Sequence, residues 1–94
     1  METLGSLCDK LCIVNLKMWH VQEEVYAIRR MSARQFKRKY SKQPGALKVV
    51  LDKATTLNLQ RNGLIDEIDM LLRDVCEGKR SVRSLTRPAC KVYR

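Results

Sequence analysis

Apolar residues recur along the first third of the chain at alternating spacings of three and four positions. This heptad spacing keeps one stripe of an α-helix facing a partner helix. It predicts a helix over about residues 3–31, and its seam comprises Leu4, Leu7, Leu11, Val14, Met18, Val21, Val25 and Ile28. A neighbouring row widens the face and comprises Cys8, Cys12, Asn15, Trp19, Gln22 and Tyr26. A face of this width favours a helical bundle over an isolated two-stranded coiled coil.

A second seam with the same spacing follows the turn signal Pro44-Gly45 and predicts a helix over about residues 46–77. The seam keeps its phase across Asn62-Gly63, so we expect the helix to continue through this dipeptide. Thr3 is placed to cap the first helix, and Gly78 lies where a glycine commonly ends a helix. One charged residue interrupts the second seam, which comprises Leu47, Val50, Ala54, Leu57, Arg61, Leu64, Ile68, Leu71 and Val75.

The segment between the two helices, residues 32–45, is a basic connector. Ser32 and Gln35 have the spacing of a capping box, and Phe36 and Tyr40 are four positions apart. This segment is therefore either a short third helix or a continuation of the first. The pattern as a whole predicts an all-α domain over residues 1–78, built as an antiparallel helical hairpin, and a basic tail over residues 79–94. Two helices alone cannot cover two wide stripes, so we expect the hairpin to dimerise into a four-helix bundle.

The positive charge of the chain is concentrated in two segments. The net charge is +9, and residues 25–51 hold eight cations and no acid, while residues 78–94 hold six cations and no acid. Cations beside aromatic residues are typical of nucleic-acid binding, because cations neutralise phosphates and aromatic rings stack on bases. A solvated helix face or tail has the same composition. Besides the tail, the candidate contacts are Arg29, Arg30, Arg34, Phe36, Lys37, Arg38, Lys39, Tyr40 and Lys42.

The cysteines Cys8, Cys12, Cys76 and Cys90 form no C-x-x-C pair, and His20 is the only histidine. These spacings predict reduced thiols and no metal site, and no motif indicates a cofactor. The apolar run over residues 11–19 contains polar interruptions and is shorter than the roughly 20 residues that span a bilayer. Because no signal-peptide pattern is present either, we expect a cytoplasmic protein without a membrane partner.

Polar residues interrupt the wide faces of both predicted helices. A buried arginine or asparagine is costly without a partner, so each helix is expected to satisfy the other, with Arg61 in reach of Glu23 or Glu24. This cluster is interpreted as a buried polar layer that sets the register of the helices. A pocket for a small ligand and a catalytic pair of His20 with a glutamate are the alternatives. The cluster comprises Asn15, Trp19, His20, Glu23, Glu24, Asn58, Arg61 and Asn62.

Two segments resemble the signature segments of a bacterial helical family, the domain of unknown function 4254. They are residues 15–23, which begin Asn-Leu-Lys-Met-Trp-His, and residues 57–69, which begin Leu-Asn-Leu-Gln-Arg-Asn. The resemblance covers about half of the chain and departs from the family pattern at Gln22 and Gly63, where the family has acidic residues. It implies a helical bundle and no established activity.

A second similarity is to the helical chorismate mutases, which often contain an Ile-Asp-x-Ile-Asp helix similar to residues 64–72. In those enzymes the motif belongs to the first helix, whereas here it lies in the last. The similarity implies cations and a glutamine that converge on a dicarboxylate. The residues of the right type are Lys48, Gln60, Arg61 and Arg73.

The sequence thus predicts a small non-enzymatic helical module that associates with a second copy or with another helical protein. The main alternative is a nucleic-acid-binding protein that uses residues 29–42 and the basic tail. A small-ligand-binding or chorismate-mutase-like helical enzyme is the remote alternative.

Overall fold

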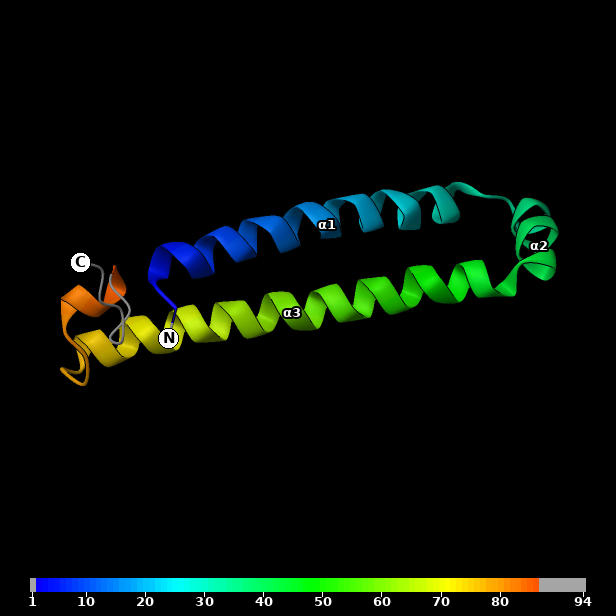
Figure 1. Cartoon of the computed structure of the whole chain (residues 1–94). Coiled ribbons are helices and arrows are strands. Elements are labelled where there is room, and N and C mark those ends of the chain that lie inside the picture. Colours follow the sequence, from blue (N-terminus) through cyan, green and yellow to red (C-terminus); the bar gives the residue numbers. More distant parts are fainter. Residues whose placement is uncertain (1, 87–94) are drawn as a thin grey trace, which may run out of the picture.

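The computed structural model describes residues 2–86 and confirms the all-α hairpin. Its helices are α1 (Leu4–Arg30), α2 (Ala33–Lys42) and α3 (Pro44–Cys76), followed by the short 3₁₀-helix η1 (Val82–Leu85). The two long helices run antiparallel, side by side, and α2 joins them at one end (Figure 1). The helices predicted over about residues 3–31 and 46–77 correspond to α1 and α3. Residues 87–94, which include Cys90 and the second half of the predicted tail, lie outside the described residues.

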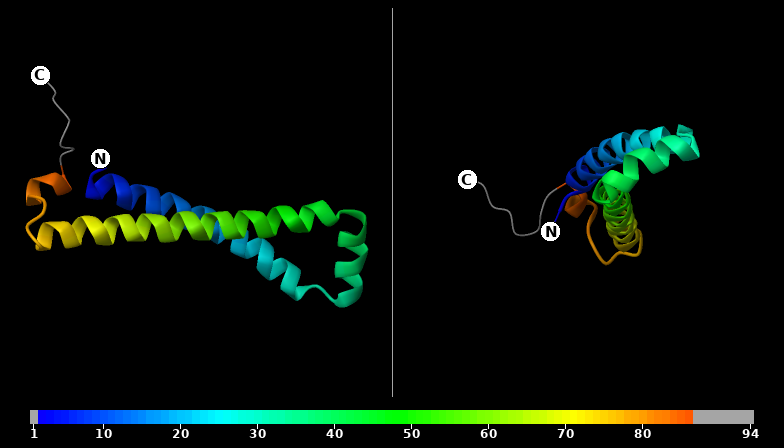
Figure 2. Two further views of the ribbon diagram at one scale, coloured as in Figure 1. Left: turned by 90° about the horizontal axis from the view of Figure 1, so that it is seen from below. Right: turned by 90° about the vertical axis from the view of Figure 1, so that its right-hand side faces the viewer.

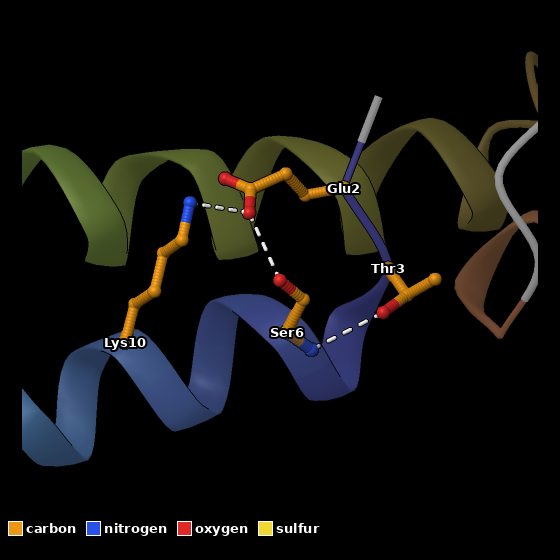
Figure 3. Close-up of polar contacts among 4 residues, drawn as sticks. All are labelled: Glu2, Thr3, Ser6 and Lys10. Carbon is orange, nitrogen blue, oxygen red and sulfur yellow. Dashed lines mark hydrogen bonds and ion pairs between the residues drawn. The ribbon is translucent and has the colours of Figure 1, made fainter.

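The first turn of α1 is held by side chains that precede it. The Ser6 backbone N–H donates to Thr3 Oγ1 at 3.1 Å, which is the capping contact predicted for Thr3. The Glu2 carboxylate accepts from Ser6 Oγ and pairs with Lys10 Nζ at 2.5 Å (Figure 3). The hydrogen bond from Lys10, followed by that from Ser6, lowers the pKa of Glu2. The carboxylate therefore stays ionised near the positive end of the helix dipole, where a negative charge is favourable.

The connector forms a separate helix, which decides the alternative that the sequence left open. Met31 and Ser32 adopt extended backbone conformations and break the path of α1. The Ser32 hydroxyl then accepts from the Gln35 N–H, and the Gln35 side chain accepts from the Ser32 N–H, so both halves of the capping box are present. Figure 2 shows that α1 crosses α3 and diverges from it toward α2, which bridges the separated ends.

Helix α3 begins with Pro44 in its first turn and continues without interruption through Gly63. Proline suits this position because the first N–H groups of a helix have no partner within the helix. At the other end Gly78 has φ +79, a left-handed conformation that glycine adopts without strain. Its N–H bonds to the Val75 carbonyl, and the chain turns there toward η1.

The core between the long helices is thin. Five apolar side chains of the described residues are buried, namely Leu7, Val14, Val21, Tyr40 and Leu71. All except Tyr40 belong to the predicted seams, and the other seam residues of α1 are half-buried. The radius of gyration is 19.7 Å, whereas a compact domain of this length has about 12 Å. Within residues 2–86 no helix carries an apolar stretch long enough to cross a bilayer.

The row of α1 residues beside the seam is not buried within one chain, contrary to the predicted wide buried face. Trp19 is 61% exposed and Tyr26 is 48% exposed, and Cys8, Cys12 and Asn15 are also exposed. The reason is geometric, because α3 is a single helix and covers only the seam of α1. Both flanks of the seam remain open to solvent.

Candidate functional site

One hydrogen bond joins the polar residues of the two long helices. Arg61 of α3 donates from Nε to Asn15 Oδ1 of α1 at 3.0 Å. Arg61 is half-buried and Asn15 is exposed, so the bond lies at the edge of the seam. The described residues include no buried polar or charged side chain, and the predicted polar layer is therefore not buried within one chain.

The predicted partner of Arg61 was wrong. In this antiparallel pair the residue numbers of facing positions add up to about 76, as they do for Asn15 and Arg61. Glu23 is eight positions along α1 from Asn15, which is two turns of helix, or roughly 12 Å at 1.5 Å per residue. Neither Glu23 nor Glu24 therefore reaches the guanidinium, and an uncharged carboxamide oxygen takes the place expected for a carboxylate.

One side of the hairpin, which we name the Trp19 face, carries the Arg61–Asn15 bond. Residues three or four positions apart on a helix are neighbours on its surface, so Asn58 and Ile65 lie on the same side of α3 as Arg61. The same spacing places Cys8, Cys12 and Trp19 in line with Asn15 on α1. We define the Trp19 face by the strip Cys8, Cys12, Asn15, Trp19, Gln22 and Tyr26 of α1 together with Leu51, Asn58, Arg61, Asn62, Ile65 and Leu72 of α3.

The opposite side of the hairpin, the groove face, is hollowed where α1 and α3 diverge. An open groove of about 610 Å³ lies between the helices, with Val21 and Leu57 among its lining residues. His20, Glu24 and Gln60 of its rim were candidates from the sequence, but the rest of the rim was not, although the α3 positions recur at helical spacing. The remaining lining residues are Lys17, His20, Glu24, Val49, Asp52, Lys53, Thr56 and Gln60.

The polar cluster predicted from the sequence is thus divided between the two sides. Asn15, Trp19, Asn58, Arg61 and Asn62 lie on the Trp19 face. His20 and Glu24 line the groove. Glu23 lies beside Trp19 and Tyr26 in a shallow concavity of α1. The structure therefore does not assemble these residues into a single catalytic or ligand-binding pocket within one chain.

The turn end of the hairpin carries the predicted nucleic-acid contacts. Phe36 and Tyr40 pack together on one side of α2, with ring centroids 4.9 Å apart, and Lys39 Nζ lies 5.4 Å from the Tyr40 ring. Tyr40 is buried and Phe36 is half-buried, so Tyr40 offers no ring face to a base, contrary to the prediction. The cations stay exposed at this end, namely Arg29, Arg30, Arg34, Lys37, Arg38, Lys39 and Lys42.

Neither a metal centre nor a mutase-like site is formed by the described residues. Cys8, Cys12 and Cys76 are free and exposed. No group of three or more His, Cys, Asp or Glu side chains within residues 2–86 is arranged to hold a metal ion. Lys48 and Arg73 are 25 positions apart on the same helix α3, or about 37 Å. They do not converge with Gln60 and Arg61 on one ligand within a chain.

Comparison with known proteins identifies one family. The model of the family described as "Protein of unknown function (DUF4254)" matches residues 1–84. This match confirms the resemblance seen in the two signature segments, which contribute the polar centre of the Trp19 face. No curated protein and no solved structure matches the chain.

Proposed function

We propose that this chain, which belongs to the DUF4254 family, is a non-enzymatic helical module that works by self-association. In this proposal two hairpins pack their Trp19 faces together and form a four-helix bundle. The observation that carries the proposal is the imbalance between five buried apolar residues and ten large apolar side chains that remain well exposed within the described residues. Four of these ten, namely Trp19, Tyr26, Leu51 and Leu72, lie on the Trp19 face.

The size of the Trp19 face suits a dimer. The strip follows α1, whose 27 residues are about 40 Å long, and it is two helices, or about 20 Å, wide. These dimensions correspond to about 800 Å², which is what each partner contributes to a standard protein interface. Five residues of the strip are polar, and its apolar part is divided between the two sides of this polar centre. Exposed apolar surface of this extent, rimmed by polar residues, is typical of a protein interaction site. A second hairpin would also supply the helices that the thin core lacks.

Sedimentation of point variants at micromolar concentration tests this proposal. We expect the wild-type chain to sediment as a dimer and Trp19→Arg to sediment as a monomer, because a guanidinium replaces the largest ring of the face. Ile13→Arg is the matched control. Ile13 is a 46% exposed apolar residue of α1 that lines a hollow on the groove side together with Gly63 and Glu67. Ile13→Arg is expected to remain dimeric.

Two outcomes would contradict the proposal. One is a wild-type chain that sediments as a monomer, and the other is an equal loss of the dimer in Trp19→Arg and Ile13→Arg. Circular dichroism of each variant at the same concentration shows whether loss of the dimer also unfolds the helices, which is the expected result for a core this thin.

Nucleic-acid binding at the turn end is the second candidate function. It is supported by the amphipathic arrangement of α2, in which the rings pack inward and five cations of one short helix face the solvent. The attraction on this surface would be to phosphates, independent of base sequence. Because Tyr40 is buried, the proposal no longer includes stacking of Tyr40 on a base.

A further inference from the structure

The hairpin has one strongly positive half and one negative half. The turn half, residues 16–60, holds ten Lys and Arg and three Asp and Glu, a net charge of +7. The terminal half of the two long helices, residues 2–15 and 61–77, holds three cations and seven acids, a net charge of −4. Residues 78–86 add three cations, of which Lys79 pairs with Glu77 at 3.0 Å and Arg80 with Asp74 at 3.5 Å. The terminal half with these residues has a net charge of −1. Residues 87–94, which lie outside the described residues, carry three further cations, so the chain outside the turn half sums to +2, still well below the +7 of the turn half.

This charge asymmetry favours one of the two directions, parallel or antiparallel, in which two Trp19 faces can pack together. A parallel pair places the two turn halves, each of charge +7, beside one another. An antiparallel pair places each turn half against the negative half of the other chain and separates the turn ends by about the length of α3. That length is about 50 Å for its 33 residues. Like charges in contact are unfavourable and screening extends only over about 8 Å at physiological salt, so the antiparallel pair is favoured.

The register of such a pair follows from the polar residues. Lys17 and Gln60 are the midpoints of α1 and α3. Their numbers add up to 77, close to the sum of 76 for Asn15 and Arg61, so they are level along the hairpin. The Arg61–Asn15 bond lies within one turn of this level. A twofold axis at the midpoint brings the polar centre of one face against that of the other and leaves the apolar ends of the strip to pack together. The Arg61 side chains of both copies then lie close to the axis, and their bonds to Asn15 keep the two guanidinium groups directed toward α1. A displacement by one heptad would bury Arg61 against apolar side chains, which costs free energy.

We infer that two copies of this chain pack antiparallel through the Trp19 face, with a twofold axis near the level of Lys17 and Gln60. This inference rests on the proposed self-association and adds its direction and register. With this axis, the numbers of facing α1 residues in the two chains add up to about 34. Cys8 of one chain then faces Tyr26 of the other, and Trp19 faces the partner's Asn15. The Arg61–Asn15 contact becomes half of a polar layer shared by both copies.

Disulfide trapping tests the direction. The test protein carries Tyr26→Cys with Cys12→Ser, Cys76→Ser and Cys90→Ser, so that Cys8 and the thiol at position 26 are its only thiols. It is incubated with oxidised glutathione, and the disulfides are identified by mass spectrometry. Within one helix the two positions are 18 residues, or about 27 Å, apart. A disulfide between positions 8 and 26 therefore has to join two chains.

The matched control carries Glu24→Cys in the same background, because position 24 lies at nearly the same level but lines the groove. We expect the 8–26 disulfide to form at least about tenfold faster than the 8–24 disulfide, a discrimination expected of a specific interface. In a parallel pair α1 of one copy packs on α3 of the other, so no 8–26 disulfide is expected. A dimer in which the 8–26 disulfide forms no faster than the 8–24 disulfide, or in which 8–8 or 26–26 disulfides are the main products, would overturn the antiparallel direction. Faster trapping at position 24 would overturn the choice of face. A test protein that sediments as a monomer, together with a monomeric wild-type chain, would overturn the self-association on which the inference rests.

Discussion

At the scale of single residues, Arg61 shows how an antiparallel register selects partners. It is the one charged member of the α3 seam, and its position was recognised from the sequence as one that needs a partner. Acidic residues were the obvious candidates because they attract a guanidinium most strongly. The actual partner is the carboxamide of Asn15, because that residue is level with Arg61 and Glu23 is two turns away. The register of the two helices therefore decides the partner, and charge does not.

A double-mutant cycle between Arg61 and Asn15 tests this contact. We expect Arg61→Leu and Asn15→Leu to be coupled by about 1 kcal/mol in urea unfolding at a fixed chain concentration, the usual size for a partly exposed hydrogen bond to a charged group. The control cycle pairs Arg61→Leu with Glu23→Leu and is expected to show coupling below about 0.3 kcal/mol, because the two side chains do not meet. Coupling to Glu23 and none to Asn15 would contradict the observed register.

At the scale of helices, most of the secondary structure could be predicted from local signals. The two seams and the caps at Thr3, Ser32 and Gly78 depend on residues within a few positions of one another, and each is present in the structure. The break at Met31 could not be decided, because a capping box permits a new helix without forbidding a continuous one. The exposure of the Trp19 face could not be predicted from one helix either, because the heptad pattern is the same whether the covering helix belongs to this chain or to a second copy.

The exposed cations of α2 give the prediction at this scale. If the turn end binds nucleic acid, its affinity for a fluorescent oligonucleotide should fall by orders of magnitude between about 50 and about 200 mM salt. The reason is that cations of the protein in contact with six or more phosphates displace the counterions bound there. Lys37→Glu with Arg38→Glu should abolish the binding. The control variant, Lys17→Glu with Lys53→Glu, changes the net charge by the same amount but on the groove face. It should retain most of the binding. Absence of binding at about 50 mM, or an equal loss in both variants, would exclude a site on α2.

At the scale of the whole molecule, shape and charge lead to the same arrangement. An elongated hairpin with extents of 61 × 30 × 15 Å is one layer of helices thick, and a helical layer needs a second layer to bury its apolar side. The turn half is basic and the terminal half is acidic, so the second layer is complementary when it runs in the opposite direction. The family signature residues Asn15, Trp19, Asn58 and Arg61 lie near the centre of the Trp19 face, and in the proposed dimer their polar side chains would set the register.

Two charge reversals with the same effect on net charge distinguish the directions of the dimer. Asp66→Lys lies in the acidic half and Glu23→Lys, beside Trp19, lies in the basic half. Both side chains are exposed. In an antiparallel dimer Asp66→Lys removes attraction to the partner's basic half, whereas Glu23→Lys adds attraction to its acidic half. At low salt we expect the dimer Kd of Asp66→Lys to rise about fivefold above that of the wild-type chain and the Kd of Glu23→Lys to fall about fivefold below it. Each exposed charge contributes about 0.5 kcal/mol, and each dimer contains two altered sites.

Both differences should disappear near 1 M salt, where the Debye length is about 3 Å. In a parallel dimer Asp66→Lys would relieve repulsion between acidic halves and Glu23→Lys would increase repulsion between basic ones. The reversed order of the two Kd values in sedimentation equilibrium would therefore exclude the antiparallel arrangement.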